Sequence, residues 1–73
     1  MPKLPVLSGQ EVCWVLEAHG FQNVRQRGSH IVMQKSEDGG TTTIPVPEHS
    51  ELRTGTLRSI IRQSGLVVDA FRK

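Results

Sequence analysis

Cysteine, aromatic residues and long apolar runs are all scarce in this sequence. Cys13 is the single cysteine, which excludes an intramolecular disulfide framework and a cysteine-rich zinc site and fits a reducing compartment. No apolar run approaches the about 20 residues that cross a bilayer, and residues 1–5 lack the apolar stretch of a signal peptide. We therefore expect a soluble, cytoplasmic protein that does not enter a membrane. Because Trp14, Phe21 and Phe71 are the only aromatic residues, the core must consist mainly of Val, Leu and Ile.

Length and charge narrow the possibilities further. The 73 residues can enclose one small core, so we expect a single domain over residues 1–73. The net charge of +2 is too small to indicate nucleic-acid binding by itself, and the distribution of charge is more informative. One basic set follows the predicted strands and a second lies near the predicted second helix: Arg25, Arg27 and Lys35, then Arg53, Arg58 and Arg62. If the fold brings the sets together, a basic face results; otherwise they are scattered, solvated charges.

The first predicted helix begins at a capping box. In Ser8-Gly9-Gln10-Glu11 the serine hydroxyl and the glutamate carboxylate can satisfy free amides at a helix start. Val12, Val15, Leu16 and His19 then follow the spacing of one buried helical stripe, and Gly20 suits a left-handed cap. The pattern predicts a helix from Gly9 to His19.

Three strands are predicted next. Residues 22–27 form the first, Gly28 and Ser29 supply a turn, and residues 30–35 form the second. Alternation puts Ile31 and Met33 on one face and His30 on the other, near Arg25 or Arg27. Residues 41–44 form a third strand, which Pro45 and Pro47 are expected to end.

A second helix follows, with Thr54 as its predicted cap and Gly65 as its end. Leu57, Ile60 and Ile61 line its apolar side, and residues 67–71 can add a short terminal helix. The order predicts an α+β fold in which two helices cover one face of a three-stranded antiparallel sheet. This is the layout of double-stranded RNA-binding domains, which read RNA by its shape, phosphates and 2'-hydroxyls.

The segment from Arg25 to His30 is the strongest candidate for chemistry. Histidine exchanges a proton near neutral pH, and the neighbouring arginines can hold a phosphate. Gly28 supplies the turn and leaves room for a close backbone approach, while Ser29 either orients His30, binds phosphate or simply occupies the turn. His19, His30 and His49 lie on different elements without metal-ligand spacing, so we expect no metal and no other cofactor. Trp14 is interpreted as a packing residue or as a contact for a protein partner.

Four segments together resemble the HicA-type toxins, the small mRNA interferases of HicA/HicB toxin-antitoxin systems. Residues 7–11 with 16–21 resemble the family's first helix and its "HGF" end, and residues 25–30 resemble "RQxGSH". Residues 43–47 resemble "TVPxH", although Pro47 and Glu48 stand before His49 where a histidine often follows directly. Residues 53–66 resemble "xKGTLxxILrqaGl", with Thr54 in place of the usual lysine.

The resemblance implies a double-stranded-RNA-binding-like fold, cleavage of mRNA, one catalytic histidine and inhibition by a HicB antitoxin. His30 is the residue that matches the catalytic position. The free toxin is expected to be a monomer and to form a hetero-oligomer with its antitoxin. The residues we expect to contact RNA are Arg25, Arg27, Gly28, Ser29, Lys35, Arg53 and Arg58.

A single histidine can suffice because the attacking 2'-hydroxyl belongs to the RNA. His30 would accept that proton or protonate the leaving oxygen, while Arg25, Arg27 or Lys35 stabilises charge on the phosphate. Two other classes stay open: an RNA-binding module without catalysis, in which replacing His30 changes little, and a protein-binding domain without salt-dependent affinity for RNA.

Overall fold

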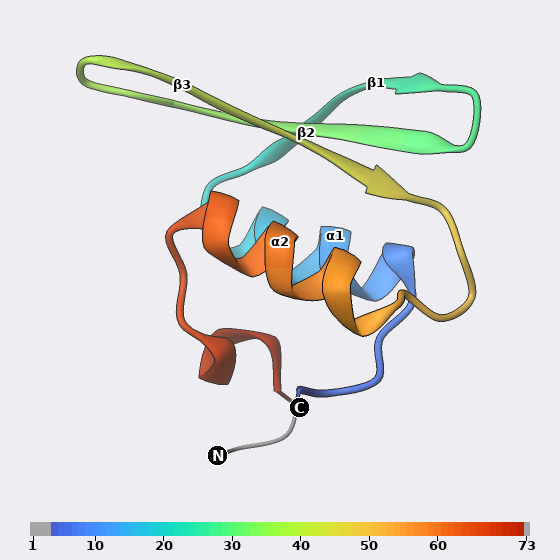
Figure 1. Ribbon diagram of the computed structural model, residues 1–73. Coiled ribbons are helices and arrows are strands. Elements are labelled where there is room, and N and C mark those ends of the chain that lie inside the picture. The colour runs from blue at the N-terminus through green and yellow to red at the C-terminus, as the bar shows by residue number, and fades with distance from the viewer. Residues whose placement is uncertain (1–3, 73) are drawn as a thin grey trace.

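A computed structural model describes residues 4–72 of the chain. Its elements follow the predicted order of helix, three strands and helix: α1 Gly9–Ala18, β1 Gln22–Arg27, β2 His30–Glu37, β3 Gly40–Pro47, α2 Thr54–Ser64 and a 3-10 turn, η1, Val68–Phe71. Both helices lie on the same side of the sheet and leave its other face open (Figure 1). The predicted α+β layout is confirmed.

The capping box at the start of α1 forms as the sequence predicts. The Glu11 amide donates to the Ser8 hydroxyl at 3.1 Å, and the Ser8 amide donates to the Glu11 carboxylate at 2.9 Å. The helix ends at Ala18, one residue before the prediction, with His19 as an exposed cap rather than a member of the buried stripe. Gly20 then adopts a φ of 97°, which turns the chain so that Phe21 enters the core.

The sheet has the order β1-β2-β3, and both pairs are antiparallel. β3 extends beyond Ile44, the last residue of the predicted strand, and ends at Pro47. Pro45 therefore lies inside the strand, paired with Val32, and Pro47 is its last residue, paired with His30. β3 is an edge strand, and an edge strand tolerates proline where the missing N–H would face away from its neighbour. Buried Ile44 and Val46 alternate with these prolines and face the helices.

The second helix starts differently from the prediction. Thr54 is its first helical residue and Arg53 is the N-cap, with no side-chain hydrogen bond to the free amides. Thr54 therefore stands one position too late for its hydroxyl to cap the helix. Gly65 ends α2 with a φ of 75°, as expected, and the following amide of Leu66 donates to the Ser64 hydroxyl at 3.1 Å.

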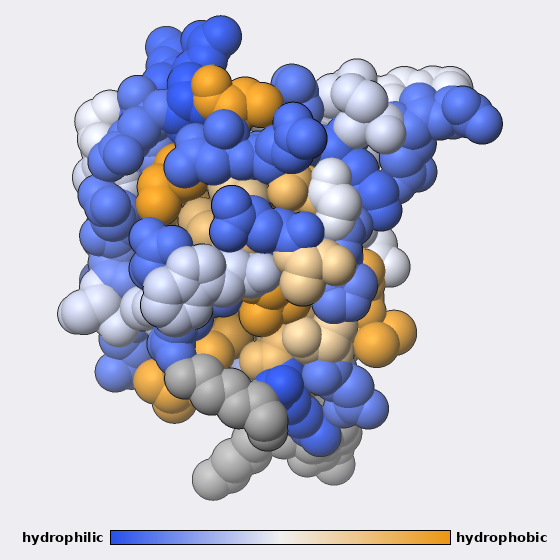
Figure 2. All heavy atoms as spheres, turned by 180° about the vertical axis from the view of Figure 1, so that it is seen from behind, coloured by the Kyte–Doolittle hydropathy of each residue, from blue (hydrophilic) through white to orange (hydrophobic). Residues whose placement is uncertain are grey.

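The core lies between the helical layer and the inner face of the sheet. Among residues 4–72 no polar or charged side chain is buried. The most completely buried large side chains are Val12, Leu16, Met33, Ile44, Val46, Leu57 and Phe71. Seen from behind, the hydrophobic surface gathers over the helical layer and is interrupted by hydrophilic side chains (Figure 2). No helix in the described range has both the length and the hydropathy needed to cross a bilayer.

Candidate functional site

A two-residue turn between β1 and β2 presents His30. Gly28 has a φ of 59° and open space where a side chain would be, and Ser29 leads directly into His30 as the first residue of β2. Alternation then places Ile31 in the core and leaves His30 exposed on the open face. The prediction that His30 lies outside the core is confirmed. Within residues 4–72 its ring has no hydrogen-bond partner, so both ring nitrogens are accessible to a ligand.

A bulge in β1 turns the two arginines to the same face as His30. Asn23 pairs with Met33, but Arg25 pairs with Val32 and Arg27 with His30, so Val24 is an extra residue in β1. Without this shift Arg25 would stand opposite Ile31, on the side of the core. A one-residue shift exchanges the two faces of a strand, and bulges often redirect side chains in this way.

The open face is hollowed beside these residues. A hollow of about 480 Å³ is lined by Arg27, His30, Val32, Thr43 and Pro45. A second hollow, of about 290 Å³, continues from it, because the two share Arg27, Val32 and Thr43. Its remaining lining residues are Val24, Arg25 and Gln34. We call the two hollows together the sheet groove.

The sheet groove carries positive charge without acidic residues in its lining. Arg25 and Arg27 contribute guanidinium groups, which stay charged at any physiological pH. Glu48 comes directly after β3 in the chain. Its carboxylate accepts a hydrogen bond from the Gln26 side chain at 3.0 Å, and its backbone amide donates to the Ser29 carbonyl at 2.7 Å. Glu48 therefore fastens the turn that holds His30, and it does not line the groove.

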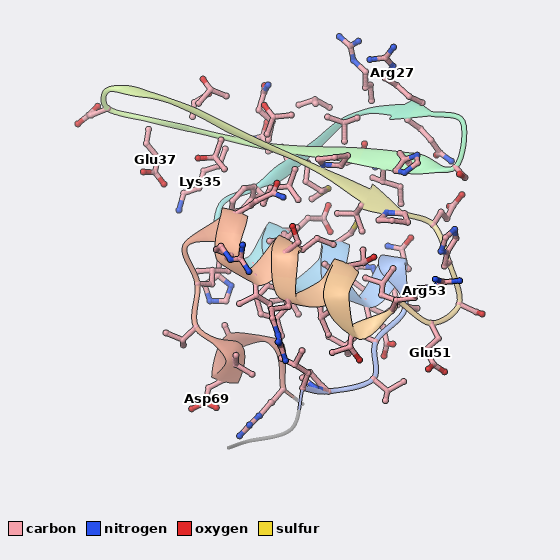
Figure 3. All side chains as sticks on the ribbon, in the orientation of Figure 1. Arg27, Lys35, Glu37, Glu51, Arg53 and Asp69 are labelled. Carbon is pink, nitrogen blue, oxygen red and sulfur yellow. The ribbon has the colours of Figure 1, made fainter. Side chains whose placement is uncertain are left out.

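Lys35 lies on the other side of the sheet. Its ammonium stands 5.7 Å from the centre of the Phe21 ring and 3.2 Å from the Glu37 carboxylate. Figure 3 shows Lys35 and Glu37 beneath the β2–β3 hairpin, while Arg27 points away from the helices. The structure thus does not bring Lys35 to His30, and its predicted contact with a phosphate stays a prediction.

The basic residues of the second helix also lie apart from the sheet groove. Arg53 caps α2 beneath the sheet (Figure 3), and Arg58 is exposed on the same helix. Neither residue lines the groove. The predicted contacts of Arg53 and Arg58 with RNA therefore stay predictions.

Comparison with protein families identifies the chain. Residues 9–66 match the family described as the HicA toxin of bacterial toxin-antitoxin systems. The chain belongs to this family. The match includes every residue that lines the sheet groove, and the resemblance drawn from the sequence motifs is confirmed. A search of curated proteins gave no match.

Five residues that line the groove of this HicA toxin are absent from the site predicted from the sequence. They are Val24, Val32, Gln34, Thr43 and Pro45. Alternation along β2 already places Val32 beside His30, but Thr43 and Pro45 join them only through the register of β3. The same two-residue period, continued along the third strand through Pro45, would predict that Thr43 and Pro45 share one face.

Proposed function

We propose that this member of the HicA toxin family is a metal-independent endoribonuclease that cleaves mRNA in the cytoplasm. His30 is its one catalytic side chain, and a HicB-type antitoxin inhibits it. The observation that carries the proposal is the position of His30: exposed, without a protein partner in the described range, and directly opposite Arg27 in the strand register. A proton-transfer group and a fixed cation thus share one groove.

The chemistry needs no group beyond these side chains and the RNA. His30 removes the proton from a 2'-hydroxyl, whose oxygen forms a bond to the adjacent phosphorus, or it protonates the 5'-oxygen as the phosphorus–oxygen bond breaks. Arg27 and Arg25 stabilise the negative charge that develops on the phosphoryl oxygens. The products are a 2',3'-cyclic phosphate and a free 5'-hydroxyl.

The turn residues have supporting parts in this proposal. Gly28 lets the RNA backbone approach the turn closely, because no side chain stands there. The Ser29 hydroxyl is a candidate donor to a phosphate oxygen next to His30. Lys35, Arg53 and Arg58 lie outside the sheet groove, so we assign them no part in the bond-breaking step.

The antitoxin is proposed to act by covering the sheet groove. An uncovered groove would leave His30 free to reach RNA, so inhibition requires either occlusion or displacement of the histidine. The free toxin is proposed to be a monomer, and the inhibited form a hetero-oligomer with the antitoxin.

Expression in bacteria tests the proposal most directly. The wild-type chain is compared with His30→Ala and with His49→Ala, which removes an exposed histidine of the connector that lies outside the groove. We expect growth arrest and mRNA fragmentation with the wild type and His49→Ala, and neither with His30→Ala at equal protein level. Sequencing of the fragments should find 2',3'-cyclic phosphate ends.

Other outcomes would contradict the proposal. Equal toxicity of all three proteins would remove His30 from catalysis, and 3'-hydroxyl ends would indicate a water nucleophile. Intact mRNA in every culture, together with salt-dependent binding of RNA in vitro, would indicate an RNA-binding module without catalysis.

A further inference from the structure

Part of the sheet groove is lined by apolar side chains, and cleavage at a phosphate does not by itself require them. Val32 is half-buried in the floor, and Pro45 and Thr43 are exposed on the neighbouring strand, opposite Val32 and Gln34 in the register. The open hollow they form with Arg27 and His30 measures about 480 Å³, which is large enough for a small organic group. A phosphate held by arginines would leave this apolar part empty.

A nucleobase fits the chemistry of this wall. Its flat faces are apolar enough to lie against valine and proline, and its edge carries hydrogen-bonding groups. The Thr43 hydroxyl accepts a hydrogen bond from the Gln34 side chain at 3.2 Å, so the hydroxyl hydrogen is left to donate to an acceptor on a base edge. The arginines provide charge complementarity for the phosphate of the same nucleotide.

Within residues 4–72 no Phe, Trp or Tyr side chain lies on the open face. Phe21 and Phe71 are buried in the core, and Trp14 is on α1, in the helical layer below the sheet. Single-stranded nucleic acids are usually stacked on aromatic rings. On this surface the aliphatic contact comes from Val32 and Pro45, beside the His30 imidazole, which is the one aromatic ring among the described residues that line the groove.

The shape of the groove also distinguishes unpaired from paired RNA. In a duplex the bases are stacked inside the helix and offer a protein their edges and the backbone, so no base face can enter a hollow. We propose that Val32, Pro45 and Thr43 form a subsite for one unstacked base of single-stranded RNA, beside the phosphate held at Arg27 and His30. This inference rests on the proposed function, because it takes RNA as the ligand.

Binding of RNA that cannot be cleaved tests the subsite separately from catalysis. The probes are short fluorescein-labelled 2'-O-methyl strands of random sequence, the same strands annealed to their complements, and an abasic backbone of equal length and charge. Fluorescence anisotropy is measured with the wild-type chain, Val32→Ser and Val67→Ser. Val67 is an exposed valine between α2 and η1, outside the groove, and gives the same chemical change as a control.

We expect the single strands to bind tighter than both the duplexes and the abasic backbone. Val32→Ser should weaken the single strands about fivefold, as expected from losing the apolar contact of one side chain, and should leave the abasic backbone unchanged. Val67→Ser should bind every probe as the wild type does.

Equal affinity for the abasic backbone and the base-bearing strand would overturn the subsite, even if His30-dependent cleavage holds. Tighter binding of the duplex would overturn it as well. Base-dependent binding without cleavage in the expression experiment would support the subsite and refute the catalytic part of the proposed function. If no probe binds, the subsite is overturned as well, and the expression experiment decides separately whether the chain cleaves mRNA.

Discussion

Gly9 is the residue at which a single methyl group should do most damage, and its replacement by alanine tests the packing that supports His30. Gly9 is buried at the start of α1, and its amide donates to the His49 carbonyl at 2.9 Å. A Cβ built there would overlap the Pro47 carbonyl oxygen and lie 3.3 Å from the Cα of Glu48. These are backbone atoms, which cannot rotate aside, and Pro47 is the strand partner of His30.

The expected loss follows from two contributions. Forcing extra volume into a packed site costs about 1–3 kcal/mol, and loss of the amide hydrogen bond costs about 1 kcal/mol more. Gly9→Ala should therefore lower the free energy of unfolding by about 2–4 kcal/mol. A chain of this length has a total free energy of unfolding of about 4–11 kcal/mol, so the loss is a large part of its stability.

Urea unfolding followed by far-ultraviolet circular dichroism measures this effect. The variants are made in a His30→Ala background, so that toxicity does not limit expression. Gly55→Ala is the matched control, because a Cβ built at Gly55 in α2 would meet no atom of the surrounding structure within 4 Å. Alanine should stabilise that position by up to about 1 kcal/mol through its higher helix propensity. The packing argument fails if Gly9→Ala unfolds within about 0.5 kcal/mol of the parent.

Three further predictions concern the groove, the core and the thiol. Arg27→Ala should slow RNA cleavage and reduce the slope of log affinity against log salt concentration by about 0.7. Lys35→Ala should leave the cleavage rate unchanged. Equal effects of the two substitutions would contradict the placement of Arg27 and Lys35 on opposite faces of the sheet. Met33→Ala should lower the free energy of unfolding by about 2–5 kcal/mol in the same urea assay, because Met33 is fully buried, and a loss below about 1 kcal/mol would contradict that placement. Burial, with a smaller effect from Glu17 and then Glu48, raises the pKa of the Cys13 thiol from 9.0 to about 11. The thiol of the unfolded chain ionises at a lower pH than the thiol of the folded protein. Cys13 should therefore favour the folded state fully below pH 9 and lose that contribution as the pH rises to about 11. At pH 8 the folded protein should react with a thiol reagent far more slowly than the protein in urea. Equal rates in the two states would refute the burial of Cys13.

Several features of the fold could be predicted because they depend on neighbours in the chain. The capping box at Ser8 and Glu11 and the left-handed glycine at Gly65 are local arrangements, and both are present. The face of His30 follows from the two-residue period of a strand. The same period places Lys35 with Ile31 and Met33, on the side of the core, so the sequence already held the information that removes Lys35 from the site.

The rest of the site depends on which strands are neighbours and in what register. The sequence of residues 22–27 does not indicate that Val24 is an extra residue in β1. A bulge is defined only by the pairing with the neighbouring strand. Both prolines can belong to β3 because β3 is at the edge of the sheet. Whether a strand lies at the edge or in the middle is decided only when the sheet assembles.

The sequence by itself determined the helices, the approximate strands and the exposure of His30, since each depends on periodicity or on groups a few residues apart. Tertiary structure decided that Arg25 and Arg27 share the face of His30 and that Val32, Thr43 and Pro45 line one groove with them. It also decided that Gly9 must lack a side chain, because Pro47 lies against it. These contacts join residues that are far apart in the chain, and their geometry is set by how the strands and helices pack rather than by local conformational preference.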